Sequence, residues 1–100
     1  MPDSAPIRIL IAEDDLPARA LVIEVLTALG HQVVAEVGSG REAIERAAEL
    51  TPDAVLLDVH MPDGSGVEAA TQITAAHPHT AVVLFTGDHT LSLSEQELVE

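Results

Sequence analysis

Three acidic residues and a threonine directly follow short apolar runs in this sequence. Glu13 and Asp14 come after the first run, Asp58 after a run in the middle of the chain, and Thr86 after the last run. Short apolar runs without polar alternation are typical of buried parallel strands. A carboxylate at the end of a buried strand is costly unless it has a partner. We therefore interpret these four residues as candidates for a functional site.

The three acids suit a divalent cation if the strands that carry them are neighbours. Carboxylates of Glu13, Asp14 and Asp58 in one pocket repel one another, so either a pKa rises or a cation intervenes. Oxygen ligands without cysteine or clustered histidine favour Mg²⁺ or Mn²⁺. One carboxylate then remains available to attack a phosphoryl group and form an acyl phosphate. The hydroxyl of Thr86 is placed to hydrogen-bond the transferred phosphoryl oxygens.

Other candidate ligands are weaker. The ring of His60 is close enough in sequence to bind the same cation, but we favour a solvated loop side chain. The other histidines show no ligand spacing and are interpreted as surface residues. Asp15, Asp63 and Asp88 are each interpreted as solvent-facing acids, which are common just beyond a strand or in a loop.

A glycine motif offers a second kind of site. The stretch from Gly38 to Ala43 reads GSGREA and matches the G-x-G-x-x-A pattern of dinucleotide-binding loops. It follows the second strand instead of the first, and Glu42 would place negative charge beside a pyrophosphate. The chain is also too short for six strands. We therefore favour a turn followed by a helix start over a cofactor site.

The residues between these candidates have the periodicity of alternating strands and helices. Strands are predicted over 7–12, 33–37, 54–57 and 81–85. The first helix is predicted from the apolar spacing of Ala18, Leu21, Val22, Val25, Leu26 and Leu29, with Pro17 in its first turn and Gly30 at its end.

Capping boxes predict three further helices. The pairs are Ser39 with Glu42, Ser65 with Glu68, and Ser92 with Glu95. The inward faces are predicted to be Ala43, Ile44, Ala47 and Ala48 on the second helix and Val67, Ala70, Ile73 and Thr74 on the third. The order βαβαβαβα predicts one α/β domain with a parallel sheet, whose ligands bind at the carboxyl ends of the strands.

Composition narrows the class of protein. The chain has 100 residues, no cysteine, no lysine and a net charge of −13. Such a charge disfavours nucleic acid as a partner, because that affinity rests on neutralising phosphates. No apolar stretch approaches the ~20 residues of a membrane span, and the N-terminus lacks a signal-peptide pattern. A cytoplasmic protein that does not bind a membrane is expected.

Three segments resemble the successive signatures of receiver domains of two-component response regulators. They are ILIAEDDLPAR, PDAVLLDVHMPDGSG and VVLFTG, and the resemblance runs in the same order from residue 7 to about residue 100. It implies a flavodoxin-like (CheY-like) doubly wound parallel sheet with strand order 2-1-3-4 and without the fifth βα unit. Residues 1–6 are expected to form a disordered tail, and residues 7–100 a receiver domain incomplete at its C-terminal end.

The resemblance also implies roles for individual residues. Glu13 and Asp14 correspond to the acidic pair that binds Mg²⁺ or Mn²⁺, Asp58 to the phosphorylated aspartate, and His60 to the residue whose backbone carbonyl binds the metal. Thr86 corresponds to the switch hydroxyl. The implied function is a phosphoacceptor in a phosphorelay, served by a sensor histidine kinase or a histidine phosphotransfer protein. Such a domain catalyses only its own phosphorylation and dephosphorylation.

The sequence departs from the family in one respect. Receiver domains normally carry a lysine on a fifth strand, and this chain contains none. It is therefore either part of a longer regulator, with room for an output domain beyond residue 100, or a divergent receiver that acts as a phosphorylation-independent interaction module. A metal-dependent phosphatase is disfavoured, because His60 stands where the second acid would be. The edge of the strand at 81–85 is expected to favour oligomers.

Overall fold

The protein, described here by a computed structural model for residues 5–63 and 65–86, contains a four-stranded parallel sheet in the order β2-β1-β3-β4. The strands are β1 (Arg8–Ala12), β2 (Gln32–Val37), β3 (Ala54–Asp58) and β4 (Ala81–Phe85). The helices are α1 (Leu16–Ala28), α2 (Gly40–Leu50) and α3 (Gly66–Ala76). This arrangement confirms the predicted flavodoxin-like order of strands.

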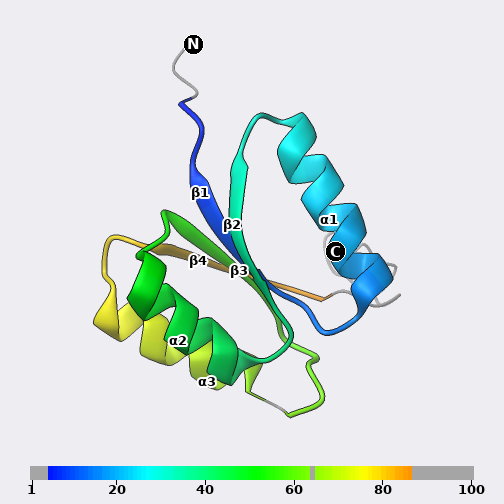
Figure 1. Ribbon diagram of the computed structural model, residues 1–100. Coiled ribbons are helices and arrows are strands. Elements are labelled where there is room, and N and C mark those ends of the chain that lie inside the picture. Colours follow the sequence, from blue (N-terminus) through cyan, green and yellow to red (C-terminus); the bar gives the residue numbers. More distant parts are fainter. Residues whose placement is uncertain (1–4, 64, 87–100) are drawn as a thin grey trace, which may run out of the picture.

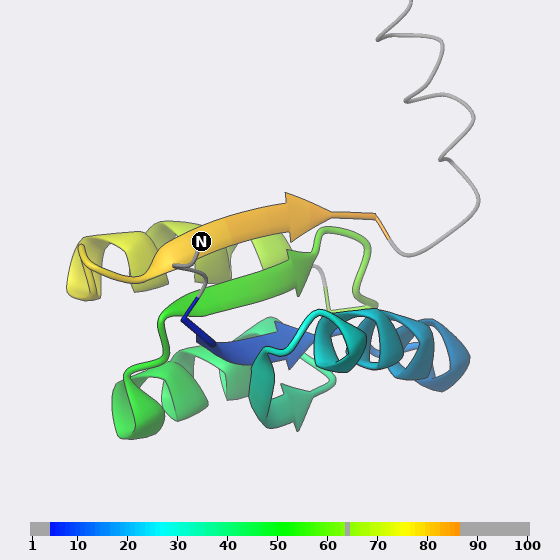
Figure 2. The ribbon, with the colours of Figure 1, turned by 90° about the horizontal axis from the view of Figure 1, so that it is seen from above.

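The helices lie on both faces of the sheet. Helices α2 and α3 pack side by side on one face, and α1 lies on the other (Figure 1, Figure 2). The main hydrophobic core fills the layer between the sheet and the α2–α3 pair. Its buried members are Leu10, Ala12, Ala35, Val37, Ala43, Ala47, Val55, Leu57, Met61, Ala69 and Ile73. These side chains are small or aliphatic, so tight packing replaces the aromatic bulk that the sequence lacks.

Two of the predicted helix starts differ from expectation. Asp15, predicted to be a solvent-facing acid only, is the N-cap of α1, and its carboxylate accepts a hydrogen bond from the amide of Ala18 at 3.0 Å. Ser65, predicted to cap α3, makes no side-chain cap. Its hydroxyl instead accepts from the Gly40 amide at 2.8 Å and donates to Asp63 Oδ1 at 2.6 Å. The Ser39 cap of α2 is confirmed, with the Glu42 amide at 3.2 Å from its hydroxyl.

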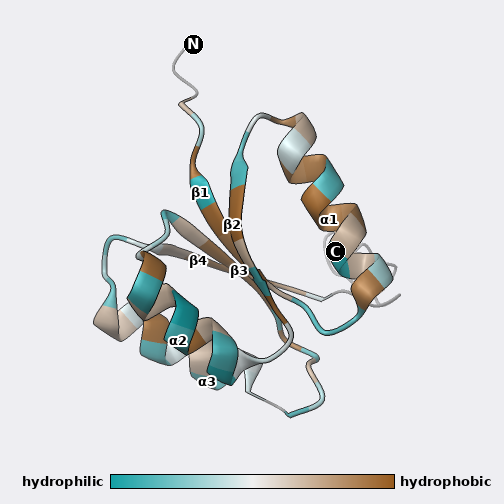
Figure 3. Ribbon diagram, viewed as in Figure 1, coloured by the Kyte–Doolittle hydropathy of each residue, from teal (hydrophilic) through white to brown (hydrophobic). Residues whose placement is uncertain are grey.

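The inward faces of the helices were predicted only in part. Ala43, Ala47 and Ile73 are buried as expected, but Ala48, Val67 and Thr74 are exposed. The deviation is larger on α1, which contains no buried residue. On its predicted inward stripe Leu21, Val25 and Leu29 are 62%, 51% and 66% exposed. Hydrophobic colour accordingly appears along the strands and also on α1 (Figure 3).

Several predictions concern residues that the structure does not describe. The helix expected from Ser92, the acid Asp88 and most of the expected N-terminal tail lie outside residues 5–63 and 65–86. Within those residues, no helix has the length and apolar character needed to cross a membrane.

Candidate metal centre

The strand order places the predicted acids together. Strands β1 and β3 are neighbours, and their register pairs Ala12 with Leu57. Glu13 follows Ala12 and Asp58 follows Leu57, so both acids lie at the same carboxyl edge of the sheet. Oxygens of the Glu13, Asp14 and Asp58 carboxylates, one from each, lie within 4.8 Å of one another. The cluster that the sequence predicted is therefore present.

Glu13 is held at several of its atoms. Its side chain is completely buried, its amide donates to the Val37 carbonyl at 2.9 Å, and its Oε2 accepts from the Asp15 amide at 2.9 Å. Its Oε1 is buried and has no hydrogen-bond donor among the described residues. An acceptor oxygen in this position costs free energy unless a proton or a cation reaches it.

The electrostatics of Glu13 agree with its burial. Burial raises the pKa of Glu13 to about 7, because the charged form loses its hydration. The Asp15 amide opposes this shift, whereas the Asp58 carboxylate, close enough to share a proton, raises the pKa further, as does the charge of Asp14. At neutral pH the carboxyl of Glu13 is therefore about half protonated when no cation is bound.

The donor set fits a hard divalent cation. All three converging groups offer carboxylate oxygens, which Mg²⁺ and Mn²⁺ prefer. Asp14 is exposed, so water can complete the coordination, while Glu13 and Asp58 are buried, with Asp58 only 3% exposed. The cation would supply the positive charge that the buried Oε1 of Glu13 lacks.

The two remaining predicted residues flank Asp58. The amide of His60 donates to Asp58 Oδ1 at 2.9 Å, and the His60 side chain is exposed, as expected for a loop. Thr86 is half-buried and directly follows Phe85, which is the register partner of Asp58 on β4. The amide of Val59 also donates to the Phe85 carbonyl at 2.9 Å. Thr86 therefore lies at the end of β4, directly after the register partner of Asp58.

The glycine loop after β2 does not resemble a phosphate cradle. The Gly38 amide donates to Glu42 Oε1 at 3.0 Å, and the Gly40 amide donates to the Ser65 hydroxyl. The two glycine amides are therefore bonded within the protein. This agrees with the turn and helix start favoured from the sequence.

Sequence reasoning missed two residues that support the cluster. The Asp15 amide holds Glu13 Oε2, and Arg19 Nε donates to the Glu13 carbonyl oxygen at 2.9 Å. Their position in the first turns after the acidic pair was a signal, since side chains and amides there lie near the end of β1. Neither residue type points to such a contact by itself.

Comparison with known proteins identifies the family. The model of the response regulator receiver domain matches residues 9–99. The transcriptional regulatory protein PdtaR of Mycobacterium tuberculosis is 38% identical over 97 residues, which cover 97% of this chain and 44% of PdtaR. The chemotaxis protein CheY of Thermotoga maritima is 34% identical over 77 residues, covering 77% of this chain and 64% of CheY.

Solved structures agree with the sequence relatives. A LuxR-family two-component response regulator from Aurantimonas sp. SI85-9A1 superposes with a TM-score of 0.78 and 25% identity, over 95% of this chain and 69% of that one. The receiver domain of NarL from Mycobacterium tuberculosis superposes with a TM-score of 0.76 and 27% identity. The match covers 94% of this chain and 77% of the NarL chain. This chain spans less than half the length of PdtaR. The protein belongs to the response regulator receiver domain family of two-component systems.

Proposed function

We propose that Asp58 accepts a phosphoryl group from a phosphohistidine of a sensor kinase or phosphotransfer protein. A carboxylate oxygen of Asp58 forms a bond to phosphorus as the bond from phosphorus to the donor imidazole breaks. The imidazole leaves with the electron pair and takes up a proton, and Asp58 becomes an acyl phosphate. We place this reaction in the cytoplasm. The chain catalyses only its own phosphorylation and the later hydrolysis of the acyl phosphate on Asp58.

The observation that carries the proposal is the convergence of Asp58 with Glu13 and Asp14, one carboxylate oxygen of each lying within 4.8 Å of the others. These groups, together with the backbone carbonyl of His60, would hold Mg²⁺ or Mn²⁺ beside the acceptor. The cation offsets the repulsion between an anionic acceptor and an anionic phosphoryl group. Glu13 would lose its proton when the cation binds, and its buried Oε1 would then be available to the cation.

The His60 amide and Thr86 both lie beside Asp58 and support this role. The His60 amide holds Oδ1 at 2.9 Å and so fixes the plane of the carboxylate. Thr86 leaves β4 next to Asp58, and we propose that its hydroxyl turns toward the phosphoryl oxygens. That movement would change the surface that a partner meets at the end of β4.

The proposal has consequences for partners. The chain covers 44% of PdtaR, which is named a transcriptional regulatory protein, so no output activity is assigned to these residues. Among the described residues β4 pairs with β3 alone, and Val83 is 49% exposed. We propose that this edge supports contacts between copies of the chain.

The test is intact mass after incubation with acetyl phosphate and Mg²⁺. We expect the gain of one phosphoryl group, lost when Mg²⁺ is chelated and absent in Asp58→Asn. Asp53→Asn is the matched control, because Asp53 precedes the same strand at its opposite end and accepts from the Arg8 amide at 2.8 Å. It should be phosphorylated like the unaltered chain.

Two results would contradict the proposal. A folded chain that gains no mass would favour the phosphorylation-independent interaction module. Equal mass gain in Asp58→Asn would place the acceptor elsewhere.

A further inference from the structure

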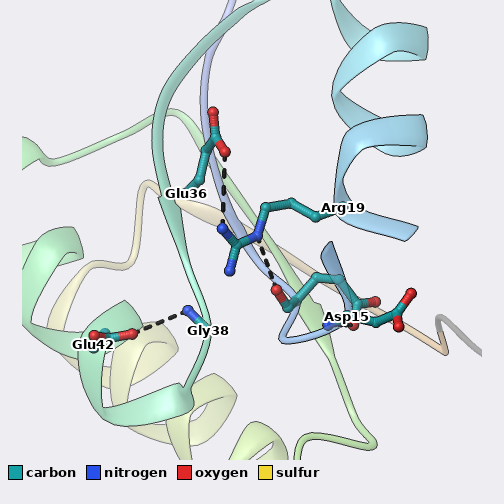
Figure 4. Close-up of polar contacts among 6 residues, drawn as sticks. Asp15, Arg19, Glu36, Gly38 and Glu42 are labelled. Atoms are coloured by element: carbon teal, nitrogen blue, oxygen red, sulfur yellow. Dashed lines mark hydrogen bonds and ion pairs between the residues drawn. The ribbon is translucent and has the colours of Figure 1, made fainter. Parts of the chain in front are cut away.

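Arg19 connects α1 to the carboxyl ends of β1 and β2. Its Nε donates to the Glu13 carbonyl oxygen at 2.9 Å, and its Nη1 lies 3.9 Å from Glu36 Oε1 on β2. Its Nη2 lies beside Gly38, where an added Cβ would be 3.4 Å away. The close-up shows Arg19 extending from α1 toward Glu36, with Gly38 and Glu42 beyond (Figure 4). The Arg19 side chain is only 17% exposed, so its position is well defined by packing.

This contact completes the restraint of Glu13. The Glu13 amide is held by Val37, its carbonyl by Arg19, and its Oε2 by the Asp15 amide. Both peptide groups that flank the Glu13 side chain are thereby fixed. Only Oε1 remains without a hydrogen-bond donor among the described residues, and it is this part of the carboxylate that can turn to a cation.

We propose that Arg19 is a positioning residue for the cation site, acting through the backbone of Glu13. The inference rests on the proposed function, because it assumes that Glu13 is a ligand. Arg19 directs its Nε–H to a carbonyl and its Nη1 to Glu36, and neither contact is to the three clustered carboxylates. Glu36 partly neutralises the guanidinium, which leaves the negative potential of the cluster in place.

The two effects of Arg19 on a bound cation have opposite signs. As a positive charge near the cluster, Arg19 repels a cation, so its removal alone would strengthen Mg²⁺ binding. As a support for Glu13, Arg19 strengthens binding, so its removal would weaken it. Groups that hold a metal ligand typically change metal affinity by about ten-fold or more when they are removed. We expect the positioning effect to dominate.

The experiment compares Arg19→Met with the unaltered chain. Met keeps most of the unbranched apolar stem of the side chain and removes both the donor and the charge. Mg²⁺ titrations followed by backbone amide NMR should give a dissociation constant about ten-fold higher or more for Arg19→Met. Arg46→Met is the control, because Arg46 pairs with Glu49 on the exposed side of α2 at 3.3 Å, and no other ion pair of Arg46 occurs within residues 5–63 and 65–86. An unchanged or lower dissociation constant in Arg19→Met would overturn the inference.

A second readout needs no metal. In the metal-free protein, hydrogen exchange of the Asp15 amide should be faster in Arg19→Met, because Glu13 Oε2 no longer keeps its place. Exchange at the Ile11 and Leu57 amides should stay slow, which shows that the sheet remains folded. Unchanged exchange at Asp15 would overturn the inference.

Two further comparisons keep the test decisive. Arg19→Lys retains the charge but replaces the planar guanidinium, whose Nε donates to the Glu13 carbonyl while Nη1 faces Glu36, with one ammonium nitrogen at the end of a flexible chain. If Arg19→Met does not fold, weaker binding in Arg19→Lys supports the inference and equal binding overturns it. A failure of the unaltered chain to bind Mg²⁺ would overturn the proposed function, whereas normal binding with no effect of Arg19 would overturn only the inference.

Discussion

Gly66 lies against the backbone carbonyl of Asp58. An added Cβ at position 66 would be 2.5 Å from the Asp58 carbonyl oxygen and 3.1 Å from the Val59 Cα. Helix α3 therefore begins in direct contact with the end of β3. Backbone atoms cannot yield as a flexible side chain can, so this contact fixes the distance between α3 and the proposed phosphoryl acceptor.

Gly66→Ala is expected to destabilise the protein. Glycine to alanine within a helix usually stabilises by up to about 1 kcal/mol, but here the methyl group must displace the backbone of β3, at a cost of roughly 1–3 kcal/mol. Urea denaturation measures the difference. Val67→Ala is the control, because Val67 is 59% exposed on the next position of the same helix. A Gly66→Ala variant as stable as the unaltered chain would mean that α3 can shift away from Asp58.

The raised pKa of Glu13 makes stability depend on pH in the metal-free protein. The folded pKa is about 7, above the ordinary value of 4.5, so the folded state binds the proton more tightly than the unfolded state. The free energy of unfolding should be highest below about pH 4.5 as far as Glu13 contributes, and should fall as pH rises to about 7. The full change is at most about 3 kcal/mol.

Urea denaturation with a chelator at pH 5 to 8 tests this dependence. Glu13→Gln, which cannot ionise, should flatten the decline over this range. Mg²⁺ should have the opposite dependence, with affinity rising as pH increases, because its ligand must be deprotonated. An equally steep decline in Glu13→Gln would assign the effect to other groups.

Ser65→Ala is expected to loosen the link between α2 and the loop after β3. The Ser65 hydroxyl bonds both the Gly40 amide and Asp63 Oδ1, and its loss should cost about 1 kcal/mol of unfolding free energy. The Ser65 hydroxyl also lowers the pKa of Asp63. A carboxyl NMR titration should therefore show the pKa of Asp63 rising in Ser65→Ala. Ser39→Ala is a useful comparison, since it removes the α2 cap and leaves Asp63 unchanged.

The fold was predictable because its signals are local and repeated. Each strand is a short apolar run, and the acids occur directly after two of them, so the adjacency of β1 and β3 was enough to bring Glu13 and Asp58 together. The Ser65 capping box failed for a tertiary reason. The Ser65 hydroxyl accepts a hydrogen bond from the Gly40 amide at the start of α2 and donates to Asp63, two residues earlier, so it is not available to cap α3.

The exposed members of the predicted apolar stripe on α1 show a different limit of sequence reasoning. Helical spacing predicts which side chains share a face, but the width of the buried part depends on what covers it. Among the described residues α1 packs mainly on β2, so Leu26 is half-buried while Leu29 is 66% exposed. Arg19 was missed for a related reason, because its partner is a backbone carbonyl, and an arginine in this position does not by itself indicate such a contact.

The position of β1 in the middle of the sheet has a consequence for how the chain folds. Glu13 and Asp58 are far apart in sequence, because α1, β2 and α2 lie between β1 and β3 in the chain. The two acids meet only when β3 pairs with β1. An unfolded chain therefore contains no preformed cation site. A cation that binds the folded protein alone shifts the folding equilibrium toward it by mass action. The ion proposed to assist phosphoryl transfer would thus also raise the free energy of unfolding, because it stabilises the state in which β1 and β3 are paired.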